Sequence, residues 1–475
     1  MRFVLDGEVH DLTGIDPTMT VLELLRYRLR RTGTKEGCAE GDCGACTVLI
    51  GALAGNAVVW RAVNACILFV PMLDGKALLT VESLGGSHQV QHEMVERHGS
   101  QCGFCTPGIV MSLVGRSMGA LGTQGLPVAD VIAGNLCRCT GYGPILAAGE
   151  AVPMTPRDDG ATIAALRAIA RTEPLALSYA DPLSGTTRLG FVARTEGQLA
   201  ALLVDHPDAR LVAGATDVGL WVTKQHRVLP TVIFIGDVAD LRGIEETDAG
   251  LRLGAGVRYS EAWPALARLH PALGELVRRI GGTQVRNSGT IGGNIANGSP
   301  IGDMPPALIA LGAELTLRCG DAGRTLPLED FFLAYGRQDR RPGEFVESVF
   351  VPRPASGALI RVDKLSKRFD SDISAVCGAF ALRIEEGRVA GARIAFGGMA
   401  GTPQRARACE TALIGRRWNE ATVEAAVAAL ADDYRPLTDV RGSAGYRRDV
   451  AGNLLRRLWL EQAGEPISVL ALAGG

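Results

Sequence analysis

The sequence has neither a long hydrophobic run nor a surplus of basic charge. Its apolar stretches stay shorter than the ~18 residues that a membrane-spanning helix requires, so we expect no association with a membrane. Lys and Arg number 49 against 51 Asp and Glu, which gives a formal net charge of −2. Nucleic-acid-binding proteins carry a basic surplus, so we expect no nucleic-acid partner. The charged and hydrophobic fractions, 21% and 47%, are typical of folded globular proteins.

Two common nucleotide-binding motifs are also missing. Gly214-x4-Gly219 has the glycine spacing of a Walker loop, but leucine follows it where that motif requires lysine. The stretch RLGAGVRY has tyrosine at the third glycine position of the Rossmann fingerprint. Neither a P-loop nucleotide site nor a Rossmann dinucleotide site is therefore expected.

A secretory signal is not indicated, because MRFVLDGEVHDL reaches Asp6 and Glu8 before any apolar core. We therefore expect a cytoplasmic location. Disulfides are rare in that reducing compartment, so the eleven cysteines are better explained as ligands and free thiols. Cys319, Cys377 and Cys409, which lie beyond residue 140, are expected to be buried small hydrophobic residues.

Four cysteines have the spacing of a plant-type ferredoxin. In KEGCAEGDCGACT, Cys38, Cys43 and Cys46 follow the order Cys-x4-Cys-x2-Cys, and Cys66 comes after nineteen further residues. Four thiolates in this order hold a two-iron two-sulfur (2Fe–2S) cluster. The loop glycines let backbone N–H groups approach an anionic cluster. Zinc is the weaker alternative, because zinc loops usually combine two Cys-x2-Cys pairs.

A second set of four cysteines is ambiguous when it is considered alone. Cys102 and Cys105 form a Cys-x2-Cys pair, and Cys137 and Cys139 form a Cys-x-Cys pair. Tetrahedral zinc and a 2Fe–2S cluster both suit four cysteines in two pairs. A thioredoxin-like redox pair would need a βαβ context. Two cysteine quartets in tandem favour electron transfer.

Hydrophobic periodicity and turn residues predict the secondary structure. A hairpin should turn at Asp6-Gly7, and a helix capped by Thr18 or Thr20 should cover residues 20–31. Further helices are expected over residues 88–98, 108–118, 128–136, 161–171, 420–432 and 445–462.

Changes in composition and in expected secondary structure divide the chain into five regions. They are a ferredoxin-like domain over 1–82, a helical domain with the second cysteine set over 83–152, a linker over 153–187, an α/β domain over 188–355 and an α+β domain over 356–475.

Two glycine-rich stretches are candidate ligand loops. The first, at residues 213–219, joins the strand-like ARLVA to a helix, where backbone N–H groups can bind phosphate. The second, SGTIGGNIANGSPIGDMPP, suits pyrophosphate and ribose contacts, although an ordinary irregular turn would have the same composition. Asp303 could accept a hydrogen bond from a ligand or could cap the helix that follows it.

Together these motifs resemble the iron–sulfur and FAD subunits of bacterial xanthine dehydrogenases, within the molybdenum hydroxylase family. The resemblance covers nearly the whole chain and is carried by GCAEGDCGACTV, QCGFCTPG, GNLCRCTGYGPI, TIGGNIANGSPIGD and KLSKRFDSDIS. It implies an α+β multidomain fold: a β-grasp ferredoxin domain, a four-helix 2Fe–2S domain, a two-part FAD domain of the vanillyl-alcohol-oxidase type and a C-terminal α+β domain. It also favours iron–sulfur over zinc for the second quartet.

The resemblance implies cofactor contacts for particular residues. One cluster is assigned to Cys38, Cys43, Cys46 and Cys66, and the other to Cys102, Cys105, Cys137 and Cys139. The FAD contacts are assigned to Leu211, Val212, Ala213, Gly214, Ala215, Thr216, Asp217, Val218, Thr290, Ile291, Gly292, Gly293, Asn294, Asp303, Val346 and Lys364. Ile280 is also assigned to the flavin site, at the position where relatives commonly place a phenylalanine against the flavin ring.

The activity that the resemblance implies is the oxidation of hypoxanthine and xanthine to urate. A molybdopterin-binding large subunit would carry the purine site, so no catalytic residue is expected in this chain. The chain would pass electrons through two 2Fe–2S clusters to FAD and on to NAD, within an (αβ)2 heterotetramer. The alternatives are the same subunit of another molybdenum hydroxylase, a free-standing iron–sulfur flavoprotein and a zinc-stapled interaction protein.

Overall fold

The computed structural model describes residues 1–465 and residue 467, so the last residues of the expected C-terminal domain lie outside the described part. The chain divides into two compact units. Unit 1 comprises Met1–Arg242, Gly256–Glu261 and Ile280–Gly293. Unit 2 comprises Gly243–Ala255, Ala262–Arg279 and Asn294–Gly475. Across the described residues, none of the helices combines the length and the apolar character needed to cross a bilayer.

Unit 1 begins with a five-stranded sheet in the order β2-β1-β5-β3-β4. The predicted hairpin is confirmed: Asp6 and Gly7 both have positive φ, as a tight two-residue turn requires, and Leu5 pairs with Glu8. Phe3 lies in the core of this sheet and is fully buried. The strands are β1 (Arg2–Leu5), β2 (Glu8–Asp11), β3 (Thr47–Ala54), β4 (Ala57–Asn64) and β5 (Ala77–Leu79).

The helix expected over residues 20–31 is shorter and less regular than predicted. Thr20 caps it as one of the two expected candidates, in a capping box with Glu23. Only Val21–Glu23 (α1) is α-helical, and Leu24–Arg28 (η1) continues as a π-helical turn. Leu24 and Leu25 are fully buried, so packing against the sheet outweighs local helix geometry here. Two 3-10 turns, Val70–Leu73 (η2) and Val81–Leu84 (η3), frame the strand β5.

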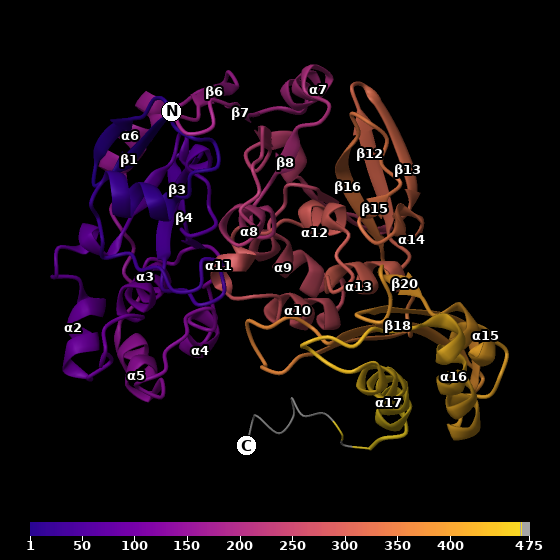
Figure 1. Ribbon diagram of the computed structural model, residues 1–475. Helices are drawn as coiled ribbons and strands as arrows, with labels where there is room; N and C mark the ends of the chain where they lie inside the picture. The colour runs from indigo at the N-terminus through magenta and orange to yellow at the C-terminus, as the bar shows by residue number, and fades with distance from the viewer. Residues whose placement is uncertain (466, 468–475) are drawn as a thin grey trace. The chain divides into compact units, whose positions relative to one another are not determined.

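The second iron–sulfur region is helical, as predicted, but its helix boundaries differ. Helix α3 is where it was expected and packs on β3 (Figure 1). The helix expected over 128–136 ends after one turn, because the following residues turn back to form the second Cys loop. A fourth helix, with Pro144 in its first turn, follows that loop. The helices are α2 (Gln89–Glu96), α3 (Thr106–Ser117), α4 (Val128–Val131) and α5 (Gly143–Ala151).

The segment expected to be a linker over 153–187 contains more structure than one helix. Its helix, α6 (Gly160–Ile169), lies on the N-terminal sheet in contact with β1, β2, β3 and β4. Its last part forms the strand β6 (Leu175–Ala180), which pairs with β7 (Thr187–Val192). The sequence around β6 is rich in proline and charged residues, which predict turns, so local sequence patterns did not predict this strand.

The flavin-type region contributes one sheet to each unit. In unit 1 the order is β6-β7-β9-β8, with β7 and β8 each parallel to the central β9. The further elements of unit 1 are α7 (Glu196–Asp205), β8 (Arg210–Val212), α8 (Val218–Thr223), β9 (Thr231–Phe234), η4 (Ala239–Arg242) and α11 (Thr283–Arg286). Helices α9 (Tyr259–Leu269) and α12 (Ile291–Asn297) run from one unit into the other.

The described part of unit 2 contains the C-terminal helices and three antiparallel sheets, the smallest of which pairs β14 with β15. The first sheet has the order β10-β11-β16-β12-β13, and the second has the order β17-β18-β19-β20. The predicted helices over 420–432 and 445–462 are confirmed as α16 and α17. The elements are β10 (Ile244–Glu246), β11 (Gly250–Gly254), α10 (Pro271–Arg278), α13 (Met304–Ala310), β12 (Glu314–Cys319), β13 (Ala322–Pro327), α14 (Leu328–Phe331), β14 (Phe332–Ala334), β15 (Arg337–Gln338), β16 (Phe345–Pro352), β17 (Leu359–Leu365), β18 (Val376–Glu385), β19 (Arg388–Gly397), β20 (Gln404–Arg405), α15 (Arg407–Leu413), α16 (Glu420–Asp433) and α17 (Ala444–Gln462).

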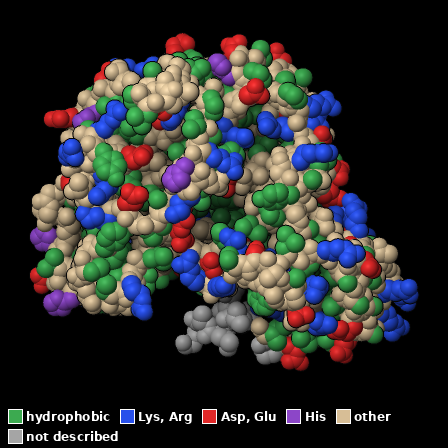
Figure 2. Space-filling view, viewed as in Figure 1, with side chains coloured by type: hydrophobic (Ala, Val, Ile, Leu, Met, Phe, Trp, Pro, Cys, Tyr) green, Lys and Arg blue, Asp and Glu red, His purple; other side chains and the backbone are tan. Residues whose placement is uncertain are grey.

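The charged side chains on the face shown in Figure 2 are mixed in sign. Basic and acidic groups intermingle there, with hydrophobic side chains scattered among them. This distribution agrees with the nearly balanced composition of the chain. Other charged side chains are buried inside each unit, among them Arg286 in unit 1 and Lys364 in unit 2.

Candidate cofactor sites

The structure brings the first cysteine quartet together at one end of the N-terminal sheet. Cys38 and Cys43 lie in the loop before β3 and are partly exposed, whereas Cys46 and Cys66 are buried. The backbone N–H groups of Asp42 and Cys43 each donate to Cys38 Sγ over 3.4 Å. The loop can curl in this way because Gly41 and Gly44 have φ of +80° and +69°. Backbone donors directed at a sulfur stabilise a thiolate, which is the form that binds iron.

The thiols of this quartet perturb one another strongly. A hydrogen bond with Cys43, followed by one with Cys66, lowers the pKa of the Cys38 thiol. The hydrogen bond with Cys38 raises the pKa of Cys43, and hydrogen bonds with Cys38 and Cys46 raise that of Cys66. Such shifts arise where several thiols share one small space and cannot all ionise without a metal.

The second quartet is also assembled, and it is more exposed. Cys102 and Cys139 are exposed and are hydrogen-bonded to each other, and Cys105 is hydrogen-bonded to Cys137. Burial, and then the hydrogen bond with Cys137, raises the pKa of Cys105 to about 12. Tyr142, in the left-handed conformation with φ of +68°, accepts a hydrogen bond from the Cys137 N–H over 2.8 Å. Tyr142 therefore shapes the Cys-x-Cys turn.

Neither quartet is arranged around a single point. Over the described residues, no three His, Cys, Asp or Glu side chains are close enough to hold one metal ion. The thiols instead interact as neighbours: Cys38 with both Cys43 and Cys66, and Cys66 with Cys46, in the first quartet, and Cys102 with Cys139 and Cys105 with Cys137 in the second. A zinc ion needs four thiolates around one centre, whereas a 2Fe–2S cluster divides them between two irons. Thiols spread over neighbouring contacts therefore suit a cluster better than zinc.

A buried polar group joins the two cysteine regions to the flavin-type region within unit 1. Gln284 of α11 is 1% exposed, and its Nε2 donates to Asn135 Oδ1 (2.9 Å), Thr47 Oγ1 (3.0 Å) and Ser112 Oγ (3.2 Å). The Leu136 N–H, one residue before Cys137, donates to the Cys43 carbonyl over 2.9 Å. Sequence reasoning missed Gln284, because no local pattern shows that it meets residues about 150 or more positions away.

The first glycine loop and the TIGG stretch lie against each other. A Cβ added to Gly214 would lie 1.8 Å from the Ser288 carbonyl oxygen, so only glycine permits this approach. A Cβ on Gly293 would lie 4.0 Å from that of Ala213. The expected irregular loop at Thr290–Gly293 is wrong: Ile291 begins helix α12, and Thr290 Oγ1 accepts from the Gly293 N–H over 3.0 Å. A strand-to-helix turn and a helix start are thus brought side by side in unit 1.

Gly214→Ala is expected to separate these two segments and to lower the flavin content of the purified protein. Overpacking of this kind costs about 1–3 kcal/mol. The measurement is FAD released per chain, together with the thermal unfolding midpoint. Gly197→Ala in α7 is the matched control, because nothing lies within 4 Å of its added Cβ. Full flavin occupancy in Gly214→Ala at a wild-type unfolding midpoint would contradict the expectation.

Helix α8, which follows the first glycine loop, packs on the first cysteine loop. Thr223 Oγ1 donates to the Ala39 carbonyl over 2.7 Å, and Lys224 Nζ donates to the Cys38 carbonyl over 2.9 Å. Gly219 lies so close to Ile67 that an added Cβ would be 2.8 Å from the Ile67 Cβ. Helix α8, which follows the candidate phosphate loop, therefore contacts the loop that carries the first three cysteines.

The predicted flavin contacts of unit 2 include a buried ion pair. Lys364 Nζ donates to Asp303 Oδ2 over 2.5 Å, and Ser374 Oγ donates to Asp303 Oδ1 over 2.5 Å. Asp303 occupies the N-cap position of α13, but its side chain makes no capping bond there, so the capping alternative is wrong. Asn294 Oδ1 is buried without a hydrogen-bond partner, which fits a residue that awaits a ligand donor. Val346 lies in β16 opposite Leu317 and is 7% exposed.

Ile280, the residue that stands where relatives place phenylalanine, lies in the turn between α10 and α11. Its backbone carbonyl accepts from Arg286 Nη1 over 3.3 Å, and Gly281 follows with φ of +54°. Arg286 is 1% exposed and also donates to the Gly281 carbonyl and Thr283 Oγ1. The backbone of this turn is therefore held by Arg286, whichever side chain occupies position 280.

Three protein-family models match this chain. The FAD binding domain in molybdopterin dehydrogenase matches residues 189–354, the CO dehydrogenase flavoprotein C-terminal domain matches 362–462 and the [2Fe-2S] binding domain matches 80–150. A solved carbon monoxide dehydrogenase from Hydrogenophaga pseudoflava is 32% identical, with a TM-score of 0.54, and the match covers 56% of this chain and 93% of that one. This chain belongs to the molybdenum hydroxylase family. The α+β multidomain fold, with iron–sulfur and FAD-binding domains, is thereby confirmed.

Curated relatives in the family are xanthine dehydrogenases. The protein from Emericella nidulans is 31% identical over 97% of this chain, and the one from Drosophila pseudoobscura pseudoobscura is 32% identical over 96%. The chain spans only 38% and 39% of the length of those two proteins. Quinoline 2-oxidoreductase from Pseudomonas putida 86 is also similar, with 25% identity and a TM-score of 0.53 over 57% of this chain and 94% of that one. Relatives in this family thus differ in the substrates their names give.

Proposed function

We propose that this chain is the electron-transfer subunit of a cytoplasmic xanthine dehydrogenase. The observation that carries the proposal is that unit 1 places two cysteine quartets and two closely packed glycine segments within one compact body. The xanthine dehydrogenases that match over nearly the whole chain support the substrate assignment. The resemblance to the iron–sulfur and FAD subunits of bacterial xanthine dehydrogenases leads us to place the molybdopterin and purine sites on a separate large subunit, in an (αβ)2 heterotetramer.

The proposed cofactors are two 2Fe–2S clusters and one FAD. Each cysteine quartet would hold one cluster, and the clusters and flavin would supply one- and two-electron chemistry between a reduced substrate and NAD. The family model for [2Fe-2S] binding covers only the second quartet. The assignment of a cluster to the first quartet rests on the ferredoxin spacing, on the N–H groups directed at Cys38 and on the contacts among its thiols.

The residues proposed to hold FAD have distinct tasks. In unit 1, the close approach of Gly214 to Ser288 sets the first glycine loop beside the start of α12, and the backbone there would bind the pyrophosphate. In unit 2, the Asp303–Lys364 pair would orient polar groups of the flavin, and the unpartnered Asn294 Oδ1 would accept a hydrogen bond. No residue of this chain is proposed to contact the purine.

The decisive experiment is purification of the native complex from the source organism. We expect a molybdopterin-containing partner in a fixed ratio, four irons and one FAD per chain, and NADH formation with xanthine. A chain that purifies alone with iron and flavin would instead be a free-standing carrier. Colourless, zinc-containing protein would overturn the redox assignment altogether.

A second candidate is the equivalent subunit of a molybdenum hydroxylase with another substrate. It is favoured by the similarity to carbon monoxide dehydrogenase and to quinoline 2-oxidoreductase. The two candidates differ only in the partner, so the same purified complex distinguishes them. Reduction of the flavin by an N-heterocycle, an aldehyde or carbon monoxide, but not by hypoxanthine or xanthine, would select the second candidate.

A further inference from the structure

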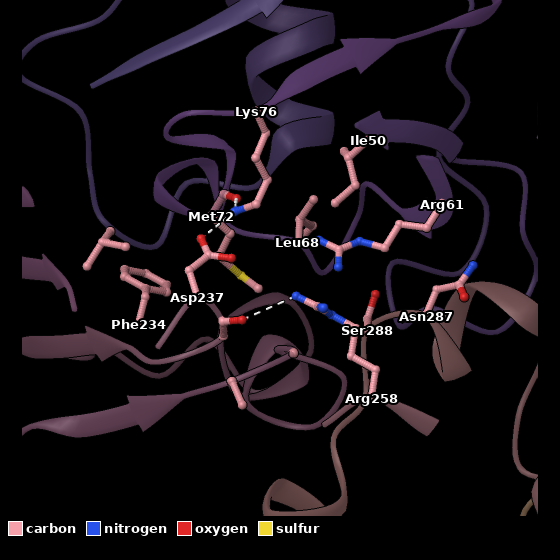
Figure 3. A pocket seen from close by; sticks show the side chains of 14 residues that line it. Ile50, Arg61, Leu68, Met72, Lys76, Phe234, Asp237, Arg258, Asn287 and Ser288 are labelled. Atoms are coloured by element: carbon pink, nitrogen blue, oxygen red, sulfur yellow. Dashed lines mark hydrogen bonds and ion pairs between the residues drawn. The ribbon is translucent and has the colours of Figure 1, made fainter. Parts of the chain in front are cut away.

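A small cavity of about 20 Å³ lies inside unit 1, next to the first glycine loop (Figure 3). Strand β4 and the segment before β5 line one side of it, and the flavin-type region lines the other. Four of its side chains are ionisable, and three of these four are cationic: Arg61, Lys76 and Arg258, against the single carboxylate of Asp237. Gly214 and Ser288, which form the tightest contact between the two glycine segments, also line it.

Arg61 is the unusual member of this group. It lies on β4, is 7% exposed and directs its guanidinium among the lining side chains (Figure 3). Its Nε is buried without a hydrogen-bond partner, and no side-chain hydrogen bond or ion pair of Arg61 is found in the described part of the chain. Buried guanidinium groups are normally paired with a carboxylate or phosphate, because an isolated buried charge is very costly. An anionic partner for Arg61 could lie in the cavity that its side chain lines.

No carboxylate nearby is left to supply that partner. Asp237 accepts from Lys76 over 2.5 Å and from Arg194 over 3.1 Å. The two other acids of the network are shared in the same way. Asp74 pairs with Arg194 (2.7 Å) and Arg171 (3.7 Å), and Glu261 pairs with Arg242 (2.5 Å) and Arg258 (3.0 Å). Each acid therefore already has two cationic partners, and the network holds six cations against three anions.

The electrostatic consequences are visible at the two cations that the N-terminal domain contributes. Burial, and then repulsion from Arg258, lowers the pKa of Arg61 to about 9. Burial lowers the pKa of Lys76 to about 8, although Asp237 opposes that effect. Guanidinium groups stay protonated in proteins, so a negative charge is needed beside Arg61 to make its burial tolerable.

We propose that the cavity binds one small inorganic anion of the halide class, with chloride as the physiological ion, paired with Arg61. The volume selects for size: about 20 Å³ holds one water-sized group, and a phosphate does not fit. The charge count selects for valence, since one cation is left without a partner. The bound ion would join β4 to the segment around Gly214 and Ser288, and would thereby support the glycine-loop contact from the side of the ferredoxin domain.

The first test is bromide substitution in crystals of the complete, cofactor-loaded protein. Bromide replaces chloride and gives an anomalous signal, so a peak beside Arg61 is expected in the wild type and none in Arg61→Met. A position filled by water that bromide does not replace would overturn the proposal. Density continuous with the flavin pyrophosphate at that point would also overturn it, because FAD itself would then be the counter-ion.

The second test is thermal unfolding of the same holoprotein in chloride and in gluconate at equal ionic strength. Chloride is expected to raise the wild-type unfolding midpoint by at least about 2 °C, because it binds the folded state only. Arg61→Met, which needs no counter-ion, should show no such dependence. Arg252→Met, at a largely exposed arginine, is the matched control and should retain the wild-type response.

These measurements separate a native site from a crystal artefact. A bromide peak combined with a wild-type midpoint that ignores chloride would mean binding at crystal concentration only, and would overturn the proposal. The wild-type measurements stand by themselves, so the proposal remains testable even if Arg61→Met fails to fold. The inference does not depend on the substrate of the complex or on the acceptor of its electrons.

Discussion

Cys43→Ala is expected to halve the iron content of the purified chain, from four irons to two, and to abolish xanthine-dependent NADH formation. Four thiolates are needed to hold a 2Fe–2S cluster, and alanine removes one of them. Cys43 is also the hydrogen-bond partner that most perturbs Cys38, so the remaining three thiols lose their organisation. Reduction of molybdenum by xanthine should survive, because we propose that this step takes place on the partner subunit. Iron analysis and low-temperature electron paramagnetic resonance would count the remaining clusters.

The control for this variant is Cys319→Ser. The prediction that Cys319 is buried is wrong: it is exposed, because it ends the strand β12 in unit 2. Its replacement should therefore leave iron, flavin and activity unchanged. Cys105→Ala should remove the other cluster and leave the first one intact, since the two quartets share no residue. Four irons and two cluster signals in Cys43→Ala would show that Cys43 is not a ligand. Normal NADH output from a two-iron protein would show that this cluster lies off the electron path.

Lys364→Met is expected to destabilise unit 2 by about 3–5 kcal/mol and to abolish flavin binding, because it leaves Asp303 buried and unpaired. Lys364 is 6% exposed and Asp303 is 9% exposed, so water cannot compensate for the lost partner. The Ser374 hydroxyl would remain as the only close donor to that carboxylate in the described structure. Chemical denaturation gives the free energy of unfolding, and released FAD per chain gives the occupancy.

A double variant separates stability from cofactor binding. Lys364→Met combined with Asp303→Leu replaces the ion pair with apolar side chains, a change that is often neutral or stabilising. It should recover the lost stability but remain free of flavin. Arg383→Met, which breaks the exposed pair with Glu385, is the control and should change neither property. Normal flavin content in the stable double variant would show that this pair has only a structural role.

Local sequence patterns determined much of this protein. The spacing of the eight cysteines predicts the members of both quartets, and that ligand assignment stays a prediction. Asp6-Gly7 marked a hairpin turn and Thr20 marked a helix start, since both depend on neighbours within four residues. Helices α16 and α17 followed from their periodicity in the same way.

Where packing competes with local preference, the pattern was less reliable. The helix expected over 20–31 changes to a π-helical turn, because Leu24 and Leu25 are drawn into the core. The helix expected over 128–136 stops at Val131, so that the chain can return to the Cys137 loop. The TIGG stretch, composed like an irregular loop, begins a helix. In each case a contact with a distant segment outweighs a local preference worth less than about 1 kcal/mol per residue.

Only the tertiary structure decided which distant side chains meet. The folded loop brings Cys38 into contact with both Cys43 and Cys66, and spacing alone does not give those contacts. Asp303 and Lys364 are 61 residues apart, and Gln284 meets Asn135 across 149 residues. Arg61 was left without a carboxylate because two folded domains close over it. Sequence spacing specifies chemistry within a loop, whereas burial and charge balance belong to segments that only the fold brings together.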